Sequence, residues 1–231
     1  MVRMRVQWLI LLVLLAALSA CAAPAAGPAQ PSEVSTVQAT EPAGEPAPAG
    51  ASEAGTVFQI QAAESEARFV IGEILGGQPN TVIGANHSVQ GQITMDLSDP
   101  AASQIGPIEI AADGFVTDSD LRNRAIRQFI LESSVNPVIT FVPDAITGLP
   151  EAAVVGESVQ LEITGDLTIR EITQPVTFRA QVTLVAQDRL EGSATATIQR
   201  ADFELTIPQV PRVAGVDEAV LLELDFAAVA Q

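Results

Sequence analysis

Apolar and polar residues alternate with a period of two along most of the chain after residue 55. The stretches 159–163, 176–184, 190–198 and 220–226 each place an apolar residue at every second position. Successive side chains of a strand point to opposite faces, so this period predicts strands with one buried and one solvated face. Further strands are predicted at 56–61, 66–75, 81–85, 88–97, 105–115 and 138–146, with turn residues such as 76–80 between them. The pattern is typical of an all-β fold of antiparallel strands.

One segment, residues 118–130, departs from the two-residue period. Asp118 and Ser119 are candidate N-caps, and the following residues repeat with the three-to-four spacing of a helix. The predicted apolar face consists of Leu121, Ala125, Ile126, Phe129 and Ile130, and the predicted polar face of Arg122, Asn123, Arg124 and Arg127. An antiparallel sheet of about nine or ten strands with one short amphipathic helix favours a closed β-barrel with a helical lid or plug.

The start of the chain has the pattern of an export signal. Arg3 and Arg5 precede an apolar run at 6–17, which is shorter than the roughly 20 residues that cross a bilayer as a helix. The sequence Leu18-Ser19-Ala20-Cys21 resembles the lipobox of bacterial lipoproteins. The resemblance implies cleavage before Cys21 and attachment of acyl chains such as palmitate, and so a membrane-anchored extracytoplasmic lipoprotein at the cell surface or in the periplasm. The alternative is a secreted protein cut near Ala20 with a free cysteine.

A second segment, residues 21–55, is rich in Ala, Pro, Gly, Ser and Glu and contains no aromatic residue. Such a composition cannot bury a core and predicts a disordered tether. The predicted organisation is therefore a signal peptide at 1–20, the lipidated Cys21 with its tether at 21–55, and one barrel domain at 56–231.

Composition excludes several classes of function. The chain has 28 acidic and 11 basic residues and a net charge of −17, which disfavours a nucleic-acid partner. It has no Lys, one His and one Cys, so Schiff-base chemistry, Cys/His metal clusters and internal disulfides are excluded, and no metal or cofactor is predicted. His87 is predicted to be a solvated or structural turn residue, with a polar contact to a ligand head group as the alternative.

The apolar faces of the predicted strands suggest a cavity. Gly192, Ala194 and Ala196 follow one another on one face and leave space, while aromatic residues on other strands can supply walls. The alternative is that large neighbours fill this space, as in any packed core. The candidate ligand-binding residues are Phe69, Ile71, Phe115, Phe129, Phe141, Phe178, Ala194 and Ala196. The helix arginines could hold an anionic head group or pair on the surface with Asp118, Asp120 and Glu132.

Several motifs in order resemble the YceI family. They are residues 65–69, 89–93, 118–123 with Phe129, 136–141, 165–170, 174–178 and 197–203, so the resemblance covers about 57–229. It implies an extended, lipocalin-like antiparallel barrel with an apolar channel for a polyisoprenoid lipid, such as an isoprenoid quinone or a prenyl phosphate. The chain departs from the family pattern in two places. Family members often carry Arg-Asp and then His-Leu in the helix, where this chain has Arg122-Asn123-Arg124-Ala125-Ile126, and the usual glycine after the late phenylalanine is replaced by Glu204.

These observations lead to one main hypothesis, a membrane-anchored extracytoplasmic carrier of a long-chain isoprenoid lipid, without catalysis. The alternative is a non-catalytic envelope-stress or protein-interaction module with a filled barrel. An enzyme is least supported, because its nucleophile, base and metal options all depend on His87.

Overall fold

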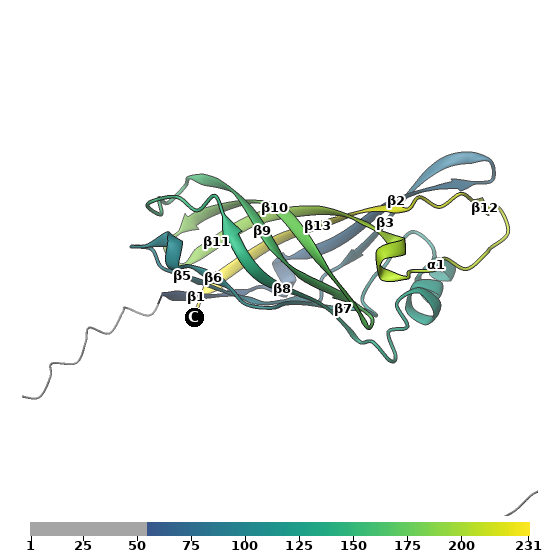
Figure 1. Ribbon diagram of the computed structural model, residues 1–231, viewed down its shortest axis with the longest axis horizontal. Coiled ribbons are helices and arrows are strands. Elements are labelled where there is room, and N and C mark those ends of the chain that lie inside the picture. The colour runs from purple at the N-terminus through teal and green to yellow at the C-terminus, as the bar shows by residue number, and fades with distance from the viewer. Residues whose placement is uncertain (1–54) are drawn as a thin grey trace, which may run out of the picture. The chain divides into compact units, whose positions relative to one another are not determined.

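Antiparallel strands make up most of the computed structural model, which describes residues 55–231 (Figure 1). The predicted signal peptide, Cys21 and nearly all of the predicted tether lie outside the described residues. The strands are β1 (Thr56–Ile60), β2 (Glu66–Leu75), β3 (Gln78–Asn86), β4 (Val89–Gln90), β5 (Gln92–Met95), β6 (Gln104–Ile105), β7 (Ile108–Ala111), β8 (Val138–Thr147), β9 (Ser158–Ile169), β10 (Ile172–Ala186), β11 (Arg189–Gln199), β12 (Val213–Ala214) and β13 (Ala219–Ala230). Between residues 55 and 231, no helix has the length and apolarity that a membrane span needs.

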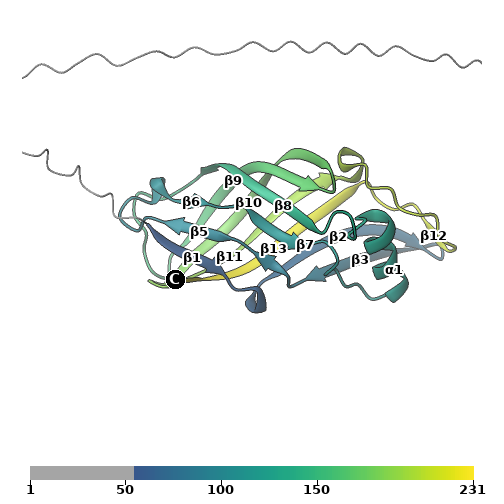
Figure 2. The ribbon, with the colours of Figure 1, turned by 90° about the horizontal axis from the view of Figure 1, so that it is seen from below.

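The strands form one sheet that curls into a barrel (Figure 2). From β7 the hydrogen-bonded order runs through β8, β9, β10 and β11 to β13 and then to β1. β5 pairs with β1, while β4, separated from β5 only by Gly91, pairs with β7. Residues 89–95 therefore link the two ends of this order, β7 and β1, and the sheet curls round on itself. This confirms the predicted antiparallel barrel.

β13 pairs with two different strands along its length. Its last residues pair with β1, whereas its first half pairs with β2, which in turn pairs with β3. The β2–β3 hairpin thus extends the barrel wall towards the end that carries the helix, as Figure 1 shows.

Most predicted strands are confirmed, and β2 has the predicted boundaries. The predicted strand 105–115 is wrong, because it divides into β6 and β7 around Gly106 and Pro107. Proline has no N–H to donate to a neighbouring strand, so pairing stops there. The predicted turn at 76–80 is too long, since Gly76 and Gly77, with φ of 60° and 87°, make the whole reversal and β3 begins at Gln78.

The two faces of the sheet separate apolar from polar side chains as predicted. On β10, Val176, Ala180 and Leu184 are buried. On the outer face, hydroxyl pairs link β9 with β10, including Thr164 with Thr177 at 2.9 Å. Such cross-strand pairs stabilise a solvated sheet surface.

The helical segment has two parts, α1 (Asp120–Ala125) and a π-helical turn (Ile126–Ile130). Ser119 caps α1 and its side chain accepts from the Arg122 N–H, so the predicted cap is confirmed. The predicted position of Asn123 on the solvated face is wrong, because this residue is 5% exposed. Its Oδ1 accepts from the backbone N–H and the hydroxyl of Thr117, both at 2.7 Å, which ties the helix to the chain that enters it.

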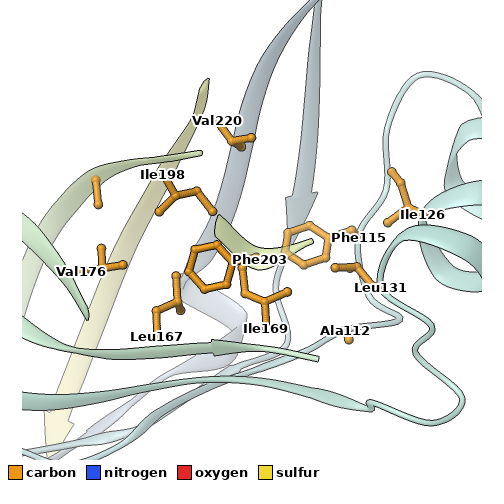
Figure 3. Close-up of a cluster of buried hydrophobic side chains, with 11 residues drawn as sticks. Ala112, Phe115, Ile126, Leu131, Leu167, Ile169, Val176, Ile198, Phe203 and Val220 are labelled. Carbon is orange, nitrogen blue, oxygen red and sulfur yellow. The ribbon is translucent and has the colours of Figure 1, made fainter. Parts of the chain in front are cut away.

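A buried cluster packs between the strands and the helical segment (Figure 3). Phe203, which is 1% exposed, lies among Leu167, Ile169 and Ile198 from the strands. Phe115 and Leu131 lie on the side of the helical segment. Short 3₁₀ helices complete the chain at Ala62–Glu64, Pro100–Ala102 and Arg200–Phe203.

Candidate ligand-binding channel

Two cavities lie inside the barrel and share part of their lining. The larger, of about 680 Å³, adjoins the helical segment, and the smaller, of about 180 Å³, lies deeper between the strands. The residues common to both are Phe69, Phe115, Ile139, Ile169 and Leu222. Because the same side chains border both spaces, the two cavities are neighbours with a shared wall, and together they are here called the channel.

The deeper cavity is lined almost entirely by apolar side chains. Phe141 and Phe178 pack edge to face there, with ring centroids 4.9 Å apart, and Met95 and Ala194 contribute from other strands. The edge-to-face pair places the positive edge of one ring against the negative face of the other. This part of the channel suits a hydrocarbon chain and offers few groups for hydrogen bonding.

The larger cavity is covered on one side by residues 205–216, here called the strap. Leu205, Ile207 and Val210 of the strap line the cavity. The strap is held to the barrel by β12, whose Val213 pairs with Leu75 and whose Ala214 pairs with Ile74.

Arg200 holds the base of the strap. Its guanidinium donates to the carbonyl oxygens of Leu205 at 2.9 Å and Asp217 at 2.7 Å, and it pairs with the Glu218 carboxylate at 2.5 Å. Leu205 begins the strap, and Asp217 and Glu218 follow its last residue, so the Arg200 side chain, which is only 12% exposed, holds the two ends of the strap together.

A charged pair lies in the wall of the larger cavity. The Glu73 side chain, 6% exposed, accepts from Arg122 and from the Asn80 amide, each at 2.9 Å. A carboxylate so deeply buried requires such partners, and together they give this end of the channel a polar character that the deeper end lacks. Arg122 also pairs with Asp118, as predicted for the helix arginines. The same prediction is wrong for Arg124 and Arg127, which have no ion pair among residues 55–231, and Glu132 pairs with Arg170 instead.

The structure places six of the eight predicted ligand-binding residues on the channel wall. Phe69, Ile71 and Phe115 line the larger cavity, and Phe69, Phe115, Phe141, Phe178 and Ala194 line the smaller one. Ala196 is 7% exposed, packs in the same buried cluster as Phe203, and borders neither cavity. Phe129 is 61% exposed and borders neither, so its predicted place on the inward face of the helix is wrong. Leu121 of the same predicted face borders the larger cavity but is 73% exposed, so its predicted burial is wrong as well.

The π-helical turn explains the outward position of Phe129. The Leu131 N–H bonds to the Ile126 carbonyl, five residues back, at 2.8 Å, where an α-helix would use a partner four residues back. This longer repeat brings Ile126 and Leu131 to the buried face and turns Phe129 away from it. The predicted apolar face assumed the α-helical period throughout.

The small residues of β11 are predicted either to leave a cavity or to be covered by large neighbours, and each prediction holds at a different residue. A side chain at Gly192 would meet the Phe226 ring at 2.8 Å, so here a large neighbour fills the space. Ala194, two residues further along the same face, borders the deeper cavity. The space left by small residues is therefore partly filled and partly open.

Sequence reasoning missed Glu73 and the strap. Glu73 continues the inward series Phe69, Ile71 at two-residue spacing. Because alternate residues of a strand face the same side, this spacing alone could have predicted an inward-facing carboxylate. The strap has no comparable signal, because its one strand, β12, contains only Val213 and Ala214.

His87 does not line either cavity. Its Nδ1 lies 2.9 Å from the Ser65 carbonyl and its Nε2 lies 3.2 Å from the Glu66 carboxylate. With 67% of the side chain exposed, this is the structural, solvated turn residue that the sequence predicts.

The fold and the channel define a class of protein, an antiparallel β-barrel with a long apolar interior that is polar at one end. Residues 58–228 match the model of the YceI-like domain, and the chain belongs to the YceI family. No curated protein matches the sequence.

Two solved structures share the fold. A polyisoprenoid binding domain from Saccharophagus degradans, implicated in plant cell wall breakdown, is 15% identical with a TM-score of 0.62, and the match covers 76% of this chain and 99% of that one. BcnA of Burkholderia cenocepacia is 20% identical with a TM-score of 0.57, covering 74% of this chain and 99% of that one.

Proposed function

We propose that this chain is a membrane-anchored extracytoplasmic carrier that binds a polyisoprenoid-type lipid, either an isoprenoid quinone or a prenyl phosphate, in its barrel. The observation that carries the proposal is the pair of adjoining cavities inside the barrel, of which the larger, at about 680 Å³, lies within the range of about 300–1,000 Å³ typical of ligand pockets. Membership of the YceI family and the solved polyisoprenoid binding domain of the same fold support it.

The gradient of polarity along the channel indicates how such a lipid would lie. The isoprenoid tail fits the deeper cavity beside Phe141, Phe178 and Ala194, and the head group fits near Glu73 and Arg122. Burial of the tail would supply the binding free energy, at about 25 cal/mol per Å² of apolar surface before entropy losses.

The alternative of a filled barrel has less support, because both cavities are open in the described residues. We also infer that the carrier acts without catalysis. The only imidazole of the chain, on His87, faces solvent outside the channel and is engaged with Ser65 and Glu66.

The anchor belongs to the proposal on sequence grounds. The lipobox-like Leu18-Ser19-Ala20-Cys21 would place an acylated Cys21 at the start of the mature chain, followed by a tether to the barrel. Metabolic labelling with a palmitate analogue should label the chain and should fail to label its Cys21→Ser variant. An unlabelled parent chain would reject the anchor.

Organic extraction of the purified chain followed by mass spectrometry tests the ligand. We expect a polyisoprenoid in the extract, or uptake of an added isoprenoid quinone or prenyl phosphate by the extracted protein. An extract without prenyl lipids, together with no uptake of either added lipid, would reject the carrier.

A matched pair of variants tests the channel itself. Ala194→Leu places extra methyl groups in the deeper cavity, whereas Ala196→Leu adds the same groups to the same strand face outside it. We expect Ala194→Leu to weaken uptake of a long isoprenoid more than that of a short one, and Ala196→Leu to affect both equally. If the two variants discriminate chain length alike, the tail does not occupy the deeper cavity.

A further inference from the structure

The larger cavity opens at a rim whose apolar residues face solvent. Leu75, Leu121 and Val210 line this cavity and are nevertheless 39%, 73% and 45% exposed. Phe129, on the same helical segment as Leu121, is 61% exposed. These four residues, here called the rim, come from the β2–β3 hairpin, the helical segment and the strap, which lie at one end of the barrel (Figure 1).

The arginines that lack an ion-pair partner in the described part of the chain are also gathered at this end of the barrel. Six arginines of the described residues pair with carboxylates, namely Arg68, Arg122, Arg170, Arg179, Arg189 and Arg200. The three that have no ion-pair partner among residues 55–231 are Arg124, Arg127 and Arg212. Arg124 and Arg127 lie on the helical segment, and Arg212 is an exposed residue that lines the larger cavity.

This distribution is unexpected in so acidic a chain. The net charge is −17, yet residues 120–130 contain three arginines and one aspartate, a local charge of +2. Asp120 stands in the first turn of α1, where the partial positive charge of the helix end favours a carboxylate. The unpaired arginines are therefore available to an anionic surface outside the chain.

From these observations we propose that the rim docks on an anionic lipid bilayer, with Leu121 and Phe129 entering the interface and Arg124, Arg127 and Arg212 contacting lipid phosphates. Exposed apolar side chains beside arginines are what an interfacial helix presents to such a surface. The patch is also continuous with the entrance of the channel, so a docked rim would let a hydrophobic ligand pass between bilayer and barrel without crossing water.

The predicted tether permits this orientation. Residue 55 leads into β1, at the end of the barrel away from α1 (Figure 1). Fully extended, residues 21–54 would span about 110 Å, whereas the 15 residues of β10 span about 50 Å. An anchored barrel could therefore turn its far end towards the membrane that holds it.

A polarity-sensitive label tests the docking at one position. The full chain with Cys21→Ser carries a single new thiol, Gln128→Cys beside Phe129, labelled with nitrobenzoxadiazole. The matched control is Gln187→Cys, an exposed glutamine in the turn between β10 and β11 at the other end of β10. With vesicles of phosphatidylcholine and phosphatidylglycerol, we expect a blue shift and protection from an aqueous quencher at position 128 but not at 187.

Two sets of variants in the labelled chain test the chemistry of the contact. Arg124→Gln with Arg127→Gln should raise the vesicle concentration needed for the shift about 30-fold, because each arginine near an anionic surface contributes about a factor of five. Leu121→Ser with Phe129→Ser should abolish the shift. Arg179→Gln, which removes one positive charge from the outer face of β10, should leave the shift unchanged.

The proposal is overturned if the label at 128 does not respond to vesicles, or if labels at 128 and 187 respond alike. A shift that grows with protein concentration in the absence of vesicles would assign the rim to a second copy and would also overturn it. The inference rests on the proposed function, but the two fail separately. If the label at 128 shifts with vesicles but the protein neither yields a polyisoprenoid on extraction nor takes up an added one, the carrier alone is rejected. If the protein binds a polyisoprenoid but the label does not shift, the docking alone is rejected.

Discussion

Glu204 occupies a backbone conformation that suits glycine better than any other residue. It ends the 3₁₀ helix Arg200–Phe203 with φ of 51° and ψ of 32°, in the left-handed region. A β-carbon in this region contacts the following carbonyl, at a cost of about 1–2 kcal/mol. The position is the one at which the sequence departs from the glycine of the YceI pattern, so the departure has a structural cost.

Replacing Glu204 with glycine should therefore stabilise the protein. We expect Glu204→Gly to raise the free energy of unfolding by about 0.5–1 kcal/mol, since part of the gain is offset by greater freedom of the unfolded chain. Urea unfolding measures the change. Asp202→Gly, two residues earlier within the helical turn, is the control and should destabilise; a loss of stability in Glu204→Gly would contradict the prediction.

Glu64 offers a test of an electrostatic contact on the outside of the barrel. Its carboxylate accepts from the Arg189 guanidinium at 2.6 Å, and this hydrogen bond, with the attraction between the charges, lowers the pKa of Glu64. A carboxyl whose pKa is lower in the folded state stabilises the fold above its unfolded-state pKa, which is about 4.3 for Glu. This contribution disappears as pH falls through the lower folded-state pKa.

We expect the Glu64 pKa to rise in Arg189→Gln, as followed by carboxyl NMR titration. Asp96 serves as an internal control, because its pKa is lowered mainly by hydrogen bonds from Ser98 and Asp99 and does not depend on Arg189. An unchanged Glu64 titration, or an equal change at Asp96, would show that Arg189 is not the cause.

At the scale of elements, the helical segment is the place where a local change of period moves a side chain from the predicted inward face to the surface. The period of two predicted the longest strands well, because strands such as β9 and β11 alternate buried and exposed residues over most of their length. The helical period failed at Phe129, since a π-helical turn depends on how Ile126 and Leu131 fit the cluster of Figure 3, a tertiary effect that spacing does not contain. The outward Phe129 that results is the residue on which the proposed docking depends. Leu121, in the regular α-helical part, is also exposed, and the π-helical turn does not account for it.

Asn123 holds this element in place, and its removal should cost stability. In Asn123→Ala, the Thr117 N–H and hydroxyl lose their acceptor in a buried site, which should lower the free energy of unfolding by about 1–3 kcal/mol. Asn123→Asp retains an acceptor oxygen and should lose less. Denaturant unfolding compares both with Gln128→Ala, an exposed change on the same segment; equal losses in all three would refute a special role for Asn123.

For the whole molecule, the sequence predicted the barrel but not how its interior is divided. Alternation shows which side chains face inward, as it does for Phe69, Phe141 and Ala194, but the open volume depends on which rings meet. Phe226 fills the space above Gly192, and the Phe69 ring lies over Gly84, whereas Ala194 borders the deeper cavity. The strap escaped prediction for a similar reason, because long-range contacts of Arg200 hold it rather than a pattern of its own.

A bound lipid should stabilise the whole barrel, because the channel runs between strands that are far apart in sequence. A ligand that binds only the folded state adds about 2.7 kcal/mol at a hundred times its Kd, which corresponds to a rise of about 5–10 °C in the melting temperature of a domain of this size. We expect a long isoprenoid quinone or prenyl phosphate to produce this rise in the extracted protein by calorimetry, and a short prenyl alcohol to produce less, since it leaves the deeper cavity empty. Ala194→Leu should reduce the difference between long and short chains, because the added methyl groups occupy the space that only the long tail reaches. A melting temperature that neither lipid changes would mean that the channel is not a binding site, whatever its volume.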